Sequence, residues 1–313
     1  LTIKAYSGNI LTAQEYWDTI LEAQRLALLD AVRIQIAYQS DYFAVNKASM
    51  TQRMAYGLGD GLNQWSLITA KPKTKNLRVT QFSAKGSLFM SSWDPIGVDG
   101  FNDTYSRTIS DILYDPSMPE SPVDGIPIAN RAEVISFETK VHRDADGNLV
   151  GEFDAPADAK IYDTKTNKWV ALGSGKKVQS IGKYKMIFSN FHHGIPMSYE
   201  DYLYGDGFSE EWRKEDEPGD PWYDAEYDSQ MSPTADVIVA KVFDEKTNTF
   251  TVYGNYNFPL DRDYAAATLA PGWSPSANAG IGVSWEISEA LARLVALGKS
   301  ASGTVWSFSG SKK

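Results

Sequence analysis

Hydrophobic and polar residues alternate in several short segments of the chain, which is the pattern of half-buried β-strands. This alternation predicts strands at residues 134–137, 159–162, 169–172, 184–188, 237–243 and 250–256. Turn-forming residues separate the last two segments, so together they predict a β-hairpin. Nearer the start of the chain, the same alternation predicts strands at residues 32–38 and 77–82.

Other segments repeat their apolar residues at the spacing of an α-helix. They predict helices at residues 12–30, 101–115 and 287–297, and Gly298 is expected to end the last one. Thr12 with Glu15, and Ser198 with Asp201, have the spacing of a capping box. Helices are therefore expected to begin at Thr12 and at Ser198.

Helices and strands are mixed along the sequence, and we predict a mixed α/β fold. Residues 133–190 consist mainly of short predicted strands joined by turns. The chain has 313 residues, too many for one small core. Two compact units, or one large α/β unit with insertions, are expected.

Composition excludes several kinds of function. The net charge of −10 disfavours nucleic acid and anionic lipid as partners, because both need a basic surface. The absence of cysteine excludes thiolate catalysis and Cys-bound zinc. No apolar run has the length of a membrane span, and residues 1–9 lack a signal-peptide pattern. Because the chain starts at Leu1, we expect a processed product or a piece of a longer protein.

Two groups of residues raise the question of a metal site. His192 and His193 are adjacent, so on a strand they would point to opposite faces and could not easily share one metal ion; we predict a structural role at a strand-to-helix turn. Asp144, Asp146 and Asn148 place oxygen ligands at alternate positions, as calcium loops do. A tight turn formed by Asp and Gly residues is the alternative, and we favour it.

Aromatic side chains provide the candidate ligand-binding residues. Trp65, Trp93 and Trp273 lie in segments that contain Gly, Pro or Ser, and Trp222 lies in an acidic stretch at residues 210–228. Such side chains can stack on sugar rings or peptide side chains when they lie in loops, although most aromatic residues pack in cores. Carboxylates beside aromatic rings also occur in glycoside hydrolases, so a carbohydrate-active enzyme or a stand-alone carbohydrate-binding module is the alternative.

Several motifs occur in an order that resembles a known family. They are Trp93-Asp-Pro95, Tyr105-Ser106, Ile109 to Asp115, Ile126 to Glu133, and Phe191-His-His-Gly-Ile-Pro-Met-Ser198-Tyr-Glu-Asp201. The chain from about residue 77 resembles the first half of an extracellular ABC-transporter solute-binding protein of family 5, which binds peptides or oligosaccharides. His193 replaces the usual Asp, a variant similar to the archaeal branch with long insertions.

The resemblance implies a periplasmic-binding-protein-like lobe at residues 77–313, with a β-rich insertion at about residues 138–180 and a preceding segment at residues 1–76. It implies a non-enzymatic protein, extracellular or periplasmic and membrane-anchored at full length, that delivers its ligand to an ABC permease in the membrane. Trp93, Trp273, Trp222 and Trp65 are the candidate ligand-binding residues. No cofactor other than calcium is expected. Because the second lobe normally follows the hairpin, we expect this chain to hold one lobe and to bind weakly.

Overall fold

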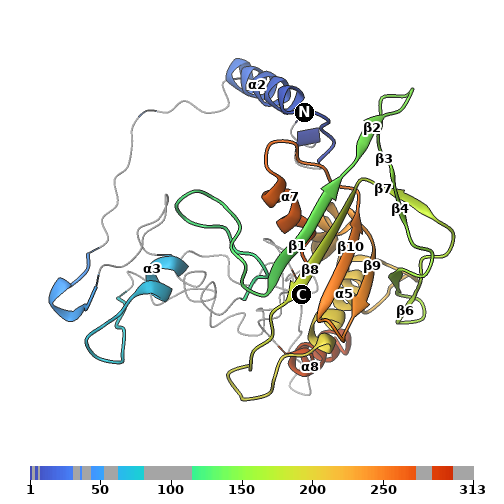
Figure 1. Ribbon diagram of the computed structural model, residues 1–313. Helices are drawn as coiled ribbons and strands as arrows, with labels where there is room; N and C mark the ends of the chain where they lie inside the picture. Colours follow the sequence, from blue (N-terminus) through green and yellow to red (C-terminus); the bar gives the residue numbers. More distant parts are fainter. Residues whose placement is uncertain are drawn as a thin grey trace.

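The computed structural model describes residues 1, 4–5, 8–30, 36, 44–52, 63–80, 115–272 and 284–298. Helices and strands are mixed in this part of the chain, as predicted (Figure 1). The helices are α2 (Ala13–Asp30), the short 3-10 helix η1 (Lys47–Ser49), α3 (Gln64–Thr69), α5 (Tyr199–Arg213), α6 (Ala225–Ala235), α7 (Arg262–Leu269) and α8 (Trp285–Ala296). The strands are β1 (Ala132–Thr139), β2 (Val141–Arg143), β3 (Leu149–Gly151), β4 (Phe153–Ala155), β5 (Lys160–Asp163), β6 (Lys168–Ala171), β7 (Lys176–Val178), β8 (Ser180–Met186), β9 (Ile238–Asp244) and β10 (Thr249–Gly254).

Six strands form one antiparallel sheet in the order β1-β8-β10-β9-β5-β6. Strands β9 and β10 are the predicted hairpin, and Asn248 takes the positive φ of 51° that its tight turn needs. Strand β5 joins β9 through one residue pair, Lys160 with Lys241. The short hairpin β5–β6 therefore extends the sheet at its edge.

Strands β2 to β7 all lie between β1 and β8 in the sequence, although β1 and β8 pair directly. Thr139 at the end of β1 is the register partner of Ser180 at the start of β8. The chain thus leaves the sheet after Thr139, forms two small two-stranded sheets and the β5–β6 hairpin, and returns beside its starting point. This strand-rich character agrees with the strands predicted there.

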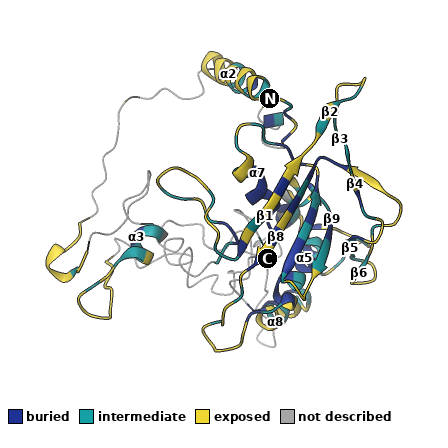
Figure 2. Ribbon diagram, in the orientation of Figure 1, coloured by how far each residue is buried: buried dark blue, intermediate teal, exposed yellow. Residues whose placement is uncertain are grey.

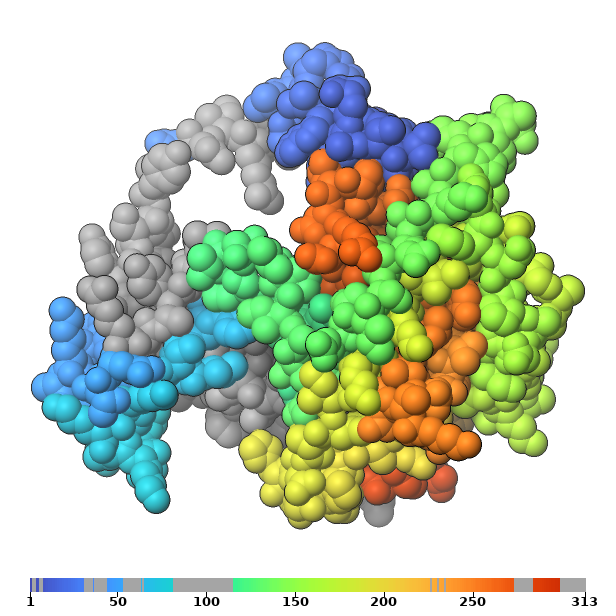
Figure 3. Space-filling model, in the orientation of Figure 1, coloured from blue at the N-terminus to red at the C-terminus, as the bar shows by residue number. Residues whose placement is uncertain are grey.

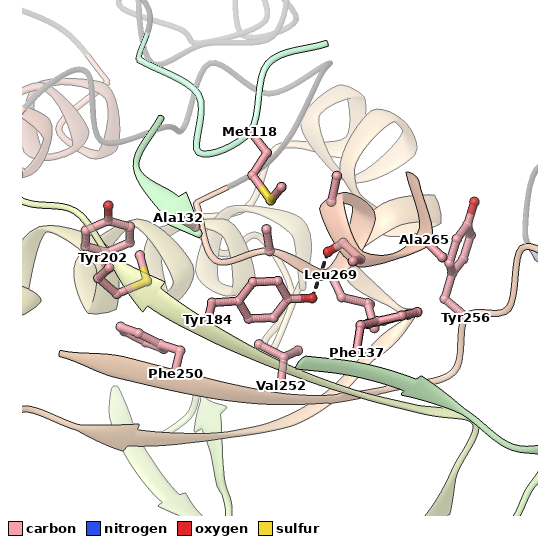
Figure 4. Close-up of a cluster of buried hydrophobic side chains, with 14 of the residues drawn as sticks. Met118, Ala132, Phe137, Tyr184, Tyr202, Phe250, Val252, Tyr256, Ala265 and Leu269 are labelled. Atoms are coloured by element: carbon pink, nitrogen blue, oxygen red, sulfur yellow. Dashed lines mark hydrogen bonds between the residues drawn. The ribbon is translucent and has the colours of Figure 1, made fainter. Parts of the chain in front are cut away.

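The core lies between the sheet and helices α5 and α7 (Figure 4). Tyr184 is fully buried there, and its hydroxyl donates a hydrogen bond of 2.7 Å to the carbonyl oxygen of Ala266 in α7. Its ring lies over Gly182, where an added Cβ would be 2.2 Å from the Tyr184 hydroxyl oxygen. Phe250 and Val252 are also fully buried. Burying a side chain of this size contributes about 1.5–3 kcal/mol, so these residues hold the helices on the sheet.

The helix starts agree with their sequence signals. Ser198 and Asp201 form a capping box at the start of α5, and the backbone N–H of Ser198 donates to Asp201 Oδ2 at 2.8 Å. At the start of α2, the N–H of Glu15 donates to Thr12 Oγ1 at 3.2 Å. The predicted last helix is α8, and Gly298 follows it with φ of 76°.

The N-terminal segment packs against the sheet domain near α7 and β2 (Figure 3). Ile10 is fully buried, and its carbonyl oxygen accepts a hydrogen bond of 2.6 Å from Asn257 Nδ2. Glu15 forms ion pairs with Lys4 and Arg143. Burial opposes its charge, but hydrogen bonds from Lys4 and the Leu11 amide and the two cations outweigh burial and lower the pKa of Glu15 to about 2. The rest of α2 is mostly exposed (Figure 2).

Two sequence predictions were wrong in the described residues. The expected strand at residues 77–82 is not formed at residues 77–80, which are exposed and irregular, so alternation there does not reflect a buried face. Trp65 was assigned to a loop but lies in α3, because the Asn63 side chain accepts from the Ser66 N–H and starts a short helix. The expected helix at residues 101–115, apart from residue 115, and the strand at residues 32–38, apart from residue 36, lie outside the described residues.

Candidate functional site

An aromatic groove lies between the β5–β6 hairpin, α5, the loop before α6, and α8. Its volume is about 580 Å³, which is in the range of sites that hold a small ligand. We call it the aromatic groove. Its lining residues are Tyr162, Asn167, Trp169, Glu200, Leu203, Tyr204, Gly207, Phe208, Glu211, Trp212, Trp222, Trp285, Glu289 and Arg293.

The β5–β6 hairpin forms one wall of the aromatic groove because α5 has a glycine beneath it. A Cβ on Gly207 would be 2.9 Å from the Tyr162 ring, so only glycine lets the hairpin approach this closely. Tyr162 and Trp169 are cross-strand partners with ring centroids 5.6 Å apart, and Trp169 also packs edge-on against Phe243 at 5.0 Å. These contacts fix the direction of both rings.

Two further tryptophans come from distant parts of the chain. Trp222 packs against the buried Trp212 with ring centroids 5.7 Å apart. The N–H of Trp222 donates to Asp220 Oδ1 at 2.8 Å, which holds the loop in place. Trp285, at the start of α8, is 38% exposed and packs against Tyr204. Its exposed face remains accessible to a ligand.

A hydrogen-bonded chain of polar groups connects α5 to α8 beside these rings. The Tyr204 hydroxyl donates to Glu289 Oε2 at 2.8 Å, and Arg293 Nε donates to Glu289 Oε1 at 2.6 Å. Burial raises the pKa of Tyr204, and the bond to Glu289 raises it further. The Tyr204 hydroxyl therefore stays neutral and holds Glu289 in one orientation.

Glu211 is the carboxyl group of the aromatic groove with the most altered acidity. Burial, together with the nearby charges of Asp216 and Asp220, raises its pKa to about 7. The amide nitrogen of Asn167 lies 2.8 Å from Glu211 Oε2 in the amide orientation that satisfies both of its ends. At neutral pH the carboxyl group can both donate and accept a hydrogen bond, which suits a ligand hydroxyl.

The structure places the sequence-predicted residues in different parts of the molecule. Trp222 lines the aromatic groove, whereas Trp65 in α3 is not among its lining residues. Trp93 and Trp273 lie outside the described residues. Sequence reasoning missed Trp169 and Trp285 because Trp169 was read only as part of a strand and Trp285 lay outside every predicted element, and the sequence places them more than a hundred residues apart.

The two groups considered for metal binding lie in turns. Asp144 Oδ1 accepts from the N–H groups of Asp146 at 3.0 Å and Asn148 at 2.8 Å in the turn between β2 and β3. His192 and His193 are exposed in the turn between β8 and α5, and His193 stacks on Phe191. Within the described residues, no cluster of three or more His, Cys, Asp or Glu side chains could hold a metal ion.

Comparison with known proteins leaves the family assignment open: no family model and no curated protein matches this chain. None of the helices in the described part of the chain is both long and apolar enough to span a membrane.

Proposed function

We propose that this chain reversibly captures an oligosaccharide or a peptide in the aromatic groove, as part of a solute-binding protein of an ABC importer. The observation that carries the proposal is the aromatic groove itself, in which Trp169, Trp222 and Trp285 come together from three separate elements. Flat apolar faces with a few fixed polar groups are the usual composition of such binding sites.

The polar groups of the aromatic groove favour a ligand rich in hydroxyl groups. Glu211 with its neighbour Asn167, and Glu289 held by Tyr204, present hydrogen-bonding atoms beside the rings. Among the described residues that line the groove, the one cation is Arg293, and it is already bound to Glu289. An oligosaccharide therefore fits these groups better than an anionic peptide does.

The transport role rests on the sequence resemblance alone. In that role the full-length protein is extracellular or periplasmic and membrane-anchored, and an ABC permease receives the ligand. The motif at residues 191–201 supplies the turn, the stiff proline and the helix cap that a strand-to-helix connection needs, and it forms that connection between β8 and α5.

Tryptophan fluorescence tests the capture of a ligand. The chain is titrated with maltohexaose, chitohexaose and a mixture of tripeptides. We expect saturable quenching by at least one of them, and a loss of affinity of about tenfold in Trp222→Ala and Trp285→Ala, since each loses one stacking face. Trp17→Ala is the matched control, because Trp17 is an exposed tryptophan of α2, away from the groove. The proposal fails if nothing binds, or if Trp17→Ala weakens binding as much as the groove variants do.

A glycoside hydrolase acting in the same groove is the second candidate. The observation that favours it is the presence of two carboxylates, of which Glu211 has the raised pKa of a general acid and Glu289 is fixed by Tyr204 and Arg293. Release of shorter sugars from maltohexaose or chitohexaose, abolished in Glu211→Gln, would establish this activity. Intact sugars after prolonged incubation would exclude it for these substrates.

A further inference from the structure

A second hollow also borders the β5–β6 hairpin and is lined by residues of α5, β5 and β9. Its volume is about 280 Å³. Among its lining residues are five cationic side chains, Lys160, Lys176, Arg213, Lys214 and Lys241, and two anionic ones, Asp206 and Glu210. We call it the lysine cavity. It has an excess of three positive charges in a chain whose net charge is −10.

Two lysines of the lysine cavity lie directly opposite each other. Lys160 of β5 and Lys241 of β9 are register partners, so their side chains leave the sheet on the same face. Like charges in this position repel each other and destabilise the pairing. Asp206 of α5 forms an ion pair with Lys241, whose side chain is only 6% exposed. Asp206 thus neutralises Lys241, whereas it forms no ion pair with the opposed ammonium group of Lys160.

The other cations of the cavity divide into paired and unpaired groups. Arg213 is bound by Glu210 and Asp236, and Lys214 is bound by Glu210. Lys160 and Lys176 form no ion pair with any other residue in the described part of the chain. Lys160 and Lys176 therefore carry the unpaired positive charge of the cavity, and Lys241 with its partner Asp206 lies opposite Lys160.

We propose that the lysine cavity binds a small oxyanion, namely a phosphate, sulfate or carboxylate group, between Lys160, Lys176 and Lys241. An ammonium group has three N–H donors, and Asp206 is the partner of Lys241, so further donors can reach an anion. Charge-assisted hydrogen bonds to an oxyanion are among the stronger ones in proteins. The bound anion would also relieve the repulsion between the opposed lysines.

The size of the lysine cavity sets the size of the ligand. Pockets for drug-sized ligands have volumes of about 300–1,000 Å³, and the cavity, at about 280 Å³, lies just below that range. It can hold an ion or one charged group but not a whole oligosaccharide. This site does not depend on the function proposed for the aromatic groove, although Tyr162 and Trp169 line both hollows.

Titration calorimetry tests the site with sodium phosphate, sodium sulfate and sodium acetate, each at the same ionic strength adjusted with chloride. We expect saturable binding of at least one anion and about tenfold weaker binding in Lys160→Met and in Lys176→Met. Tighter binding of phosphate and sulfate than of acetate would show that the site prefers tetrahedral anions over a carboxylate. Circular dichroism confirms that each variant is folded.

Lys183→Met is the matched control, because Lys183 is an exposed lysine of the same sheet that does not line the cavity. Its affinity should equal that of the unaltered chain. Absence of binding for all three anions, or equal affinities in Lys160→Met, Lys176→Met and Lys183→Met, would overturn the proposal.

Discussion

The aromatic groove and the lysine cavity share one wall but differ in almost every physical respect. Tyr162 and Trp169 of the β5–β6 hairpin line both of them. The groove offers flat rings and a carboxyl group that is half protonated near pH 7, whereas the cavity offers ammonium groups. Helix α5 contributes different sides of its surface to the two hollows. One short hairpin on a helix can therefore create two sites of opposite chemistry.

Breaking the Lys241–Asp206 ion pair of the lysine cavity is expected to have the largest effect on stability. Lys241→Met leaves Asp206 without its partner, and we expect the free energy of unfolding to fall by about 3 kcal/mol, because breaking a buried ion pair leaves a charge uncompensated. Urea denaturation measures it. In Lys241→Met/Asp206→Leu most of the loss should be recovered, since no buried charge remains. A single variant as stable as the unaltered chain would show that the pair is solvated.

Displacing the β5–β6 hairpin, which lines both hollows, is expected to have the next largest effect on stability and to weaken binding at both. In Gly207→Val the new side chain would collide with the Tyr162 ring, at a cost of about 1–3 kcal/mol. Displacement of the hairpin should weaken ligand binding in the aromatic groove and anion binding in the lysine cavity together. Gly175→Val is the control, because nothing lies within 4 Å of a Cβ added there. Loss of binding at one hollow only would mean that the wall is not shared.

Glu211 of the aromatic groove is expected to make the stability of the chain depend on pH. The pKa of Glu211 is about 7 in the folded chain, above the ordinary value of 4.5, so the folded chain holds its proton longer and stability falls as the pH rises between these values. Glu211→Gln removes this loss. We expect its melting temperature to exceed that of the unaltered chain by roughly 2 °C at pH 8 and to match it at pH 4. An equal difference at both pH values would contradict the raised pKa.

The β2–β3 turn is expected to show no binding effect, which makes it a reference for both hollows. Asp144 already accepts hydrogen bonds from two backbone N–H groups, as a plain turn requires. Neither EDTA nor added calcium should then shift the melting temperature, whereas a bound ion would raise it by mass action. A rise with calcium that disappears in Asp144→Asn would establish a calcium site instead.

The sequence predicted elements where one local signal was strong. The alternation of apolar and polar residues predicted the β9–β10 hairpin, and capping residues predicted the starts of α2 and α5. Helix α7 was not predicted, since its run of three alanines has little amphipathic pattern and is buried against the sheet. Helix α6 was missed because its first residues belong to the acidic stretch at residues 210–228 and its last turn includes Pro233.

The candidate site was less predictable than the fold, since it depends on contacts between distant segments. Trp222 was among the candidates from its acidic stretch and lines the groove, but Trp169 and Trp285, which line the same groove, carry no local sign of sharing it. The opposition of Lys160 and Lys241 depends on the register of two strands about eighty residues apart, which alternation alone does not specify.

The pairing of Thr139 with Ser180 has a consequence for how this protein can change over evolution or by engineering. Residues 140–179 start and finish at neighbouring positions of adjacent strands, so a two-residue turn can replace them and leave β1 and β8 joined as a simple hairpin. The replaced segment includes Lys160, Tyr162 and Trp169, which line the two hollows. Exchanging residues 140–179 for another segment could therefore alter which ligands the two hollows bind, while the pairing of β1 with β8 stays the same.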